Sequence, residues 1–153
     1  MKVYLGADHR GFKLKDELKI WFIENKIDGE DMGAFEYDPE DDYPIFAEKV
    51  AKRVAEDLGK NLDVRGIVIC GSGVGVDIVA NKFHHVRSGL AVSPKQIEEA
   101  RGDDDINILS IPADFMSGKE AKKIVKIFLE TPFSEEEKKI RRLGEIEKIE
   151  DGL

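Results

Sequence analysis

The sequence has 153 residues and one cysteine, and 24 basic against 32 acidic side chains give a formal net charge of −8. One cysteine excludes an intramolecular disulfide framework, and the acidic balance argues against nucleic-acid binding, which needs a basic face. The apolar share of 41% suits a buried core, while apolar runs of only a few residues exclude a membrane span or signal-peptide core. We therefore expect a single cytoplasmic domain over residues 1–153.

Short apolar runs alternate with longer amphipathic segments along the chain. The runs predict five strands, at residues 3–5, 27–35, 66–70, 88–92 and 106–111. Apolar residues at helical spacing follow the first strand, from Leu14 to Phe22, and the second strand, from Phe46 to Leu58. This alternation is typical of parallel βαβ units and predicts an α/β fold with an open, doubly wound sheet.

Three serines predict helix starts in the second half of the chain. Ser93 precedes a proline and is followed by Gln96, and Ser117 is followed by Glu120, as in capping boxes. Ser134 repeats the pattern ahead of a last helix over residues 134–150. Because that helix is highly charged outside one apolar stripe, we expect it to extend from the body and contact a second subunit.

In a doubly wound sheet, the ligand lies beyond the carboxyl ends of the strands. These ends carry Asp8-His9, the segment from Cys70 to Asp77, Ser93 and the region around Asp114. His9 can bind phosphate, act in acid–base chemistry, or simply cap and pack. No cysteine or histidine spacing resembles a metal site, so we predict no metal. The acidic run at residues 38–42 favours a solvated loop.

The segment Cys70-Gly71-Ser72-Gly73-Val74-Gly75 is the most informative in the chain. Its glycines permit close backbone approach and expose N–H groups that bind phosphate or an oxyanion. Val76 replaces the third glycine of the dinucleotide fingerprint, and no P-loop lysine follows. A thiol beside such amides favours its thiolate, which could remove a carbon-bound proton. The plain structural alternative is a tight turn around an inert cysteine.

The last helix carries a basic cluster of Lys138, Lys139, Arg141 and Arg142. Within it, Lys138 and Arg142 are four residues apart and share one face. The default interpretation is a solvated face whose cations pair with the glutamates at residues 135–137. The functional interpretation is an anion clamp, because arginine binds phosphate in a bidentate manner.

Together these motifs resemble the family of ribose-5-phosphate isomerase type B and galactose-6-phosphate isomerase, from about residue 3 to about residue 149. The matching segments are residues 6–11, Asp42-Tyr43-Pro44, residues 70–75, Ala80-Asn81-Lys82, Arg87 and Arg141-Arg142. The resemblance implies a Rossmann-like three-layer α/β/α sandwich, forming a homodimer or tetramer with each site built from both subunits. It also implies isomerisation of a phosphosugar through a cis-enediol, without metal or cofactor.

The resemblance implies roles for individual residues. Cys70 is the proton-abstracting base, because the glutamate that one branch of the family uses corresponds to Val76 here. Ser72 handles the substrate hydroxyl, and the amides of residues 71–75 form an anion hole. The implied substrate-binding residues are Asp8, His9, Asp42, Tyr43, Gly71, Gly73, Val74, Gly75 and Asp104. The implied phosphate-binding residues are His9, Lys138 and Arg142.

Three acidic residues depart from the family pattern. Asp103 replaces a ring-opening histidine, Asp104 a substrate-contacting asparagine, and Asp114 an arginine of the phosphate region. Asp103 could replace the histidine as acid or base, although the low ordinary pKa of aspartate makes it a poor acid near neutral pH. The resemblance implies isomerase chemistry on ribose 5-phosphate and ribulose 5-phosphate or on a related pentose, hexose or tetrose phosphate. The change at Asp103 favours a four-carbon substrate, which needs no ring opening. The alternatives are a non-catalytic or regulatory homologue and a nucleotide-binding module.

Overall fold

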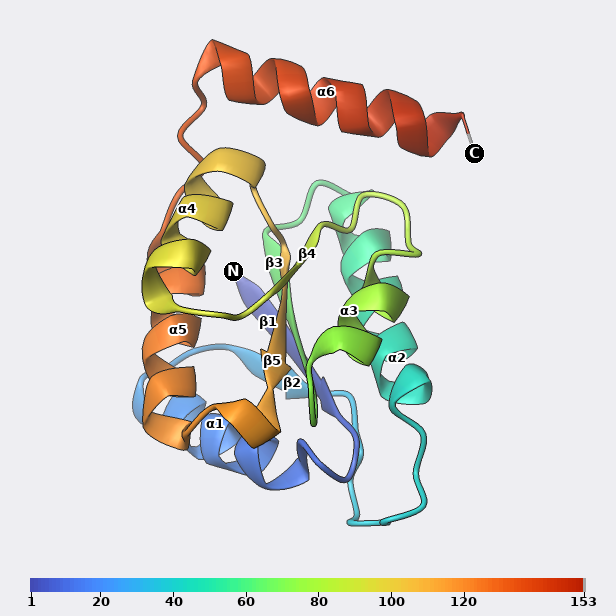
Figure 1. The fold of residues 1–153 in the computed structure, drawn as a ribbon, viewed down its shortest axis with the longest axis vertical. Coiled ribbons are helices and arrows are strands. Elements are labelled where there is room, and N and C mark those ends of the chain that lie inside the picture. The colour runs from blue at the N-terminus through green and yellow to red at the C-terminus, as the bar shows by residue number, and fades with distance from the viewer. Residues whose placement is uncertain (153) are drawn as a thin grey trace.

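The computed structural model describes residues 1–152 and contains one sheet of parallel strands in the order β2-β1-β3-β5-β4 (Figure 1). The strands are β1 (Lys2–Ala7), β2 (Gly29–Asp31), β3 (Val64–Cys70), β4 (Ser88–Leu90) and β5 (Ile108–Pro112). The helices are α1 (Phe12–Glu24), α2 (Tyr43–Leu58), α3 (Val74–Ala80), α4 (Pro94–Asp104), α5 (Gly118–Glu130) and α6 (Glu137–Asp151), with a short 3-10 turn, η1 (Ala113–Phe115). The predicted doubly wound, five-stranded α/β fold is confirmed.

Side-chain alternation along the strands separates two hydrophobic cores. Val3 and Leu5 of β1 point to the face that is covered by α1, α4 and α5. Tyr4 between them points to the opposite face, which is covered by α2 and α3. Central strands buried on both faces explain why residues 66–70 form an unbroken apolar run in the sequence.

The second strand is short and polar because it lies at the edge of the sheet. Only Gly29–Asp31 pair with β1, within the longer segment that the sequence predicted. The Asp31 carboxylate accepts from the buried ammonium of Lys15 at 2.6 Å and lies 2.7 Å from the ammonium of Lys19. An edge strand has one open side, so charged residues are tolerated there.

The three predicted serine caps have different outcomes. Ser117 forms a complete capping box with Glu120. Ser93 caps α4 by accepting from the Gln96 backbone at 3.2 Å, but the Gln96 side chain bonds to Val92 and Leu90 instead of returning to Ser93. The prediction for Ser134 is wrong, because α6 begins at Glu137.

Ser134 fails as a cap because it is tied to another element. Its backbone N–H donates to the carbonyl of Gly102 in α4 at 3.1 Å, and the following Glu135 has a φ of +54°. The chain turns into the last helix only after this contact. Figure 1 shows α6 lying across one end of the molecule, beyond the ends of the sheet and the other helices.

The last helix leaves its apolar stripe largely uncovered. Ile140, Ile146 and Ile149 are 52%, 45% and 66% exposed, and α6 contains no buried residue. Among residues 1–152, no helix combines the length and apolarity that crossing a membrane requires.

Candidate functional site

The carboxyl ends of the strands lie together at one end of the sheet, at the bottom of Figure 1. We call this end the carboxyl edge, as distinct from the lateral edge formed by β2. The carboxyl edge gathers three segments that are distant in sequence: the turn after β1, the glycine-rich loop after β3, and η1 after β5. The backbone N–H of Asp8 donates to Ile69 at 3.2 Å, and that of Asp114 donates to Gly71 at 3.0 Å. The predicted convergence of these strand ends is therefore confirmed.

Cys70 ends β3 and is 4% exposed. Its Sγ accepts a hydrogen bond from the backbone N–H of Gly73 at 3.2 Å. Gly73 adopts the left-handed φ of +73°, which turns the chain back over the sulfur. A backbone donor aimed at the sulfur stabilises negative charge that develops there.

The hydroxyl of Ser72 lies in the same loop. The residue is exposed, and its Oγ accepts from the backbone N–H of Val74 at 3.4 Å. The hydroxyl proton therefore points away from this bond and is available to a ligand oxygen.

Tyr43, at the start of α2, contacts the glycine-rich loop, and Asp42 directly precedes it. The Tyr43 ring lies against Gly75 so closely that a Cβ added there would sit 2.7 Å from the ring. Asp42 occupies the N-cap position of α2 without a side-chain cap bond and is exposed, so its carboxylate faces solvent. Because Gly75 has no side chain, the Tyr43 ring can pack directly against the glycine-rich loop that follows Cys70.

Asp8 is a buried carboxylate, 4% exposed. Its Oδ1 accepts from the backbone N–H groups of Arg10 and Gly11, both at 3.0 Å. Burial raises the pKa of Asp8, although these two backbone donors act in the opposite direction. The two bonds fix the Asp8 carboxylate in the turn after β1, at the carboxyl edge.

His9 is held by Asp41, a residue that the sequence analysis did not single out. Its Nδ1 lies 2.7 Å from Asp41 Oδ1, and its backbone N–H donates to the same oxygen at 2.9 Å. The Asp41 side chain is 9% exposed, so the solvated-loop interpretation of residues 38–42 is wrong for this residue. The sequence did not distinguish Asp41 from the other acidic residues of this run, because residue type alone does not show which side chain points inward.

Sequence reasoning also did not identify Arg10 as the partner of Asp114, the acidic residue that departs from the family pattern. The two side chains form an ion pair, and the Arg10 guanidinium lies over Gly71, where an added Cβ would meet it. The hydrogen bond with Asp114 raises the pKa of Arg10 further. The extra negative charge at Asp114 is therefore compensated within the chain.

The remaining candidate residues lie at the opposite end of the sheet. Asp103 and Asp104 are in the last turn of α4, and Lys138 and Arg142 are in the first half of α6, at the top of Figure 1. The Asp103 carboxylate lies 2.6 Å from the ammonium of Lys139. One copy of the chain does not bring these residues together with Cys70.

The predicted pairing of the α6 cations with the preceding glutamates holds only for Lys139. Its ammonium lies 3.0 Å from Glu136, whereas Arg141 lies 3.8 Å from Glu145 of the next turn. Within residues 1–152, neither Lys138 nor Arg142 forms an ion pair, and both are exposed.

Asp8, His9 and Asp41 are the only group in the described part of the chain whose donor atoms could together hold a metal, all within 4.8 Å. However, His9 Nδ1 is already engaged with Asp41. Because a metal would have to displace that bond, we assign the cluster to hydrogen bonding.

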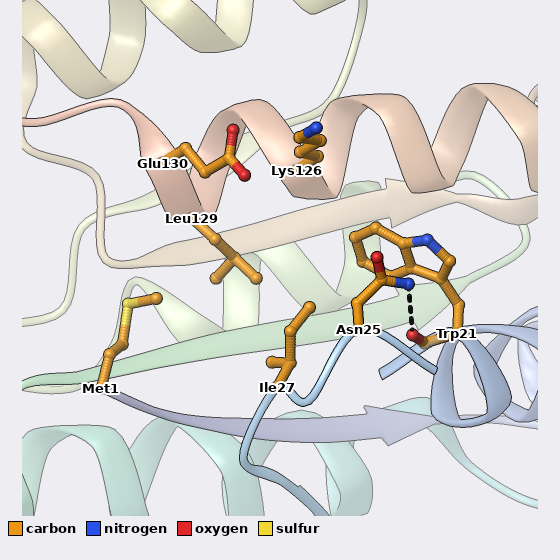
Figure 2. A pocket seen from close by; sticks show the side chains of 7 residues that line it. All are labelled: Met1, Trp21, Asn25, Ile27, Lys126, Leu129 and Glu130. Carbon is orange, nitrogen blue, oxygen red and sulfur yellow. Dashed lines mark hydrogen bonds between the residues drawn. The ribbon is translucent and has the colours of Figure 1, made fainter. Parts of the chain in front are cut away.

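A separate cavity of about 230 Å³ lies between the ends of α1 and α5, near the start of β1 (Figure 2). Trp21, Ile27, Leu129 and Met1 supply its apolar wall, and the Asn25 amide donates to the Trp21 carbonyl at 2.8 Å. None of the candidate site residues lines it, so we do not connect it with the chemistry of the cysteine loop.

Comparison with known proteins gives one consistent family. Residues 3–146 match the family model described as Ribose/Galactose Isomerase. A ribose-5-phosphate isomerase B from Mycolicibacterium paratuberculosis is 38% identical over 94% of this chain and 87% of its own length. A probable ribose-5-phosphate isomerase B from Mycoplasma genitalium is 37% identical over 86% of this chain and 84% of its length.

Solved structures show the same similarity. The Mycoplasma genitalium ribose-5-phosphate isomerase B crystallised with ribulose 5-phosphate has a TM-score of 0.93 and 34% identity, covering 99% of this chain and 97% of that one. The type B enzyme of Trypanosoma cruzi has a TM-score of 0.91 and 32% identity, covering both chains fully.

Proposed function

Because this chain belongs to the ribose/galactose isomerase family, we propose that it interconverts an aldose phosphate and a ketose phosphate through a cis-enediol, with Cys70 as the base. The family match supports the reaction class. The observation that carries the mechanism is the Gly73 N–H donated to Cys70 Sγ at 3.2 Å, at the carboxyl edge of the sheet.

In this mechanism the Cys70 thiolate removes the proton from C2 of the open-chain aldose. The C2–H electron pair forms the C1–C2 double bond, and the carbonyl oxygen at C1 takes up negative charge and a proton. The thiol then returns its proton to C1 while the C2 hydroxyl loses its proton, which gives the ketose. The base is regenerated and atoms balance without an added reagent.

The residues around the cysteine suit the other steps. Ser72, with its free hydroxyl proton, transfers protons between the two substrate oxygens. In the loop of residues 71–75, the Gly73 and Val74 amides donate to Cys70 Sγ and Ser72 Oγ, and the other amides of the loop stabilise the enediolate oxygen. In other enzymes one such donor contributes ~2.7–4 kcal/mol. Asp8, Asp42 and Tyr43 surround the sugar hydroxyls from the β1 turn and the start of α2.

Phosphate binding completes the proposal and requires a second copy of the chain. His9 lies at the carboxyl edge, whereas Lys138 and Arg142 lie at the far end of the same chain on a helix with an uncovered apolar stripe. A homodimer in which α6 packs on the partner would bring these cations to the partner's His9. Asp103 and Asp104, at the same end as α6, would enter that shared site. We propose that residues 1–153 form one domain and that residues 134–150 supply the subunit contact.

Substitution of the cysteine tests the mechanism. We expect Cys70→Ala to lose at least ~1000-fold in kcat on ribose 5-phosphate, since the base is removed and general-base effects are of this order. Far-UV circular dichroism and the thermal midpoint should remain near those of the wild type. The matched control is Val92→Ala, which shortens an exposed side chain just after β4. Near-normal turnover by Cys70→Ala would remove Cys70 from the mechanism.

The same assay addresses the substrate. Ribose 5-phosphate closes to a furanose, whereas a tetrulose 4-phosphate cannot form that ring. Because the Asp103 carboxylate stands in the place of a ring-opening histidine and is engaged by the Lys139 ammonium at 2.6 Å, Asp103 should open rings poorly. We expect a higher kcat/KM on the tetrulose phosphate. A clear preference for ribose 5-phosphate would contradict the short-substrate proposal and leave the isomerase proposal intact.

A further inference from the structure

The histidine at the end of β1 is fixed by a single carboxylate oxygen. Asp41 Oδ1 accepts the backbone N–H of His9 at 2.9 Å and lies 2.7 Å from its ring Nδ1. One oxygen therefore holds both the main chain and the ring of the same residue. This arrangement restricts rotation of the imidazole. Because a carboxylate oxygen accepts, the ring nitrogen that faces it, Nδ1, carries a proton.

The surroundings of Asp41 make this contact more than a surface pair. Its side chain is 9% exposed, and its second oxygen, Oδ2, is buried without a hydrogen-bond partner in the described part of the chain. A largely enclosed carboxylate whose second oxygen has no hydrogen-bond partner is stabilised by a cation beside it. Asp41 thus favours the doubly protonated, cationic form of His9.

The outward side of the ring is open. The His9 side chain is 26% exposed, and within residues 1–152 its Nε2 makes no hydrogen bond. The charged groups that act on His9 are Asp8 and Asp41, while the neighbouring Arg10 side chain pairs with Asp114. The hydrogen bond to Asp41 is the main cause that raises the pKa of His9, and the Asp8 charge acts in the same direction.

We infer that Asp41 is a positioning residue for phosphate recognition, which keeps His9 cationic and directs its Nε2–H toward the phosphate of the substrate. The inference rests on the proposed function for the identity of the anion. It assigns to residue 41 a role that is distinct from those of Asp42 and Tyr43 beside it.

The sign of the expected pH dependence follows from this role. A raised pKa means that His9 stays protonated over a wider range toward neutral pH, and its contribution to anion binding is lost as the pH rises through that pKa. Without the Asp41 charge, the loss should occur at lower pH. In a shared site, Lys138 and Arg142 of the second copy would oppose the protonation, which makes the Asp41 contribution more important.

The test compares Asp41→Asn with the wild type and with Glu40→Gln, which removes an exposed charge from the same loop. The asparagine oxygen can still accept both hydrogen bonds, so geometry is retained while the charge is lost. We expect KM for ribose 5-phosphate to match the wild type near pH 6 and to be at least about fivefold higher near pH 8, with kcat nearly unchanged. Glu40→Gln should behave as the wild type.

Two measurements keep the inference independent of turnover. NMR titration of His9 should show a lower midpoint in Asp41→Asn than in the wild type. Binding of inorganic phosphate should weaken with rising pH sooner in the variant. An equal KM increase at both pH values, or an unchanged midpoint, would overturn the inference. Absence of isomerase activity in the wild type would instead overturn the proposed function, while the phosphate titration would still decide the role of Asp41.

Discussion

Glycines in one short loop show how differently two identical residues are constrained. Gly73 has a φ of +73°, and a Cβ there would lie 2.6 Å from Leu90 Cδ1 and 3.0 Å from the backbone nitrogen of Pro112. Gly71 lacks a left-handed φ, and the three atoms nearest to an added Cβ all belong to the guanidinium of Arg10. Because Arg10 is half exposed, it can move, whereas the backbone of β5 cannot.

Alanine substitutions should separate these two constraints. We expect Gly73→Ala to lower the free energy of unfolding by at least about 1–2 kcal/mol, the usual cost of a left-handed conformation for a residue with a Cβ. Gly71→Ala should cost less, because its clash is relieved by moving one side chain. Urea denaturation of both variants measures the difference. A larger loss for Gly71→Ala would show that the Arg10–Asp114 pair is more rigid than its exposure implies.

Helix starts show the limit of local patterns at the scale of elements. Ser117 and Ser134 are each followed, three residues later, by a glutamate. Ser117 makes both bonds of the capping box, while the segment of Ser134 is held by Gly102 of α4 and starts no helix. A contact between elements replaced the local cap, and the sequence pattern contains no information about that contact.

Serine-to-alanine substitutions should therefore differ in cost. We expect Ser117→Ala to lower the free energy of unfolding by about 1 kcal/mol, because the N-cap of α5 is lost. Ser134→Ala should change it by less than about 0.5 kcal/mol, as is usual for surface positions. Thermal denaturation followed by circular dichroism compares the stability of the two variants. Equal losses would mean that the Ser134 side chain has a structural role beyond the backbone bond seen here.

At the scale of the whole molecule, the candidate site is divided between two ends. Asp8, His9, Cys70 and Tyr43 lie at the carboxyl edge of the sheet. The cations of α6 lie at the other end, on a helix that covers little of its own chain. Association of two copies would cover the apolar stripe and complete the set of charges in the same step.

Complementation between two inactive variants tests this arrangement. In a shared site, Cys70→Ala and the double variant Lys138→Ala/Arg142→Ala remove groups that come from different copies. Co-expression should restore about one quarter of the wild-type activity, because half of the dimers are mixed and each mixed dimer has one intact site. The activity of each variant alone is the control. No recovery in a purified mixed dimer would place all these groups in one chain's site and contradict the proposal.

The sequence by itself determined the fold class, five parallel strands and the positions of Asp8, His9 and Cys70 at strand ends. These features follow from periodicity, from glycines and from the rule that parallel strands end at one edge, and all of them are local or topological. Strand boundaries shifted by a few residues, because the length of a strand depends on its pairing partners.

Only the tertiary structure decided which charges meet. Asp41 points inward and contacts His9. Arg10 pairs with Asp114, more than one hundred residues away in sequence, and Lys139 pairs with Asp103. Each pair joins side chains from different elements, and its existence depends on distance and burial. Sequence spacing does not encode these quantities, because Coulomb energy depends on separation in space and on exclusion of water.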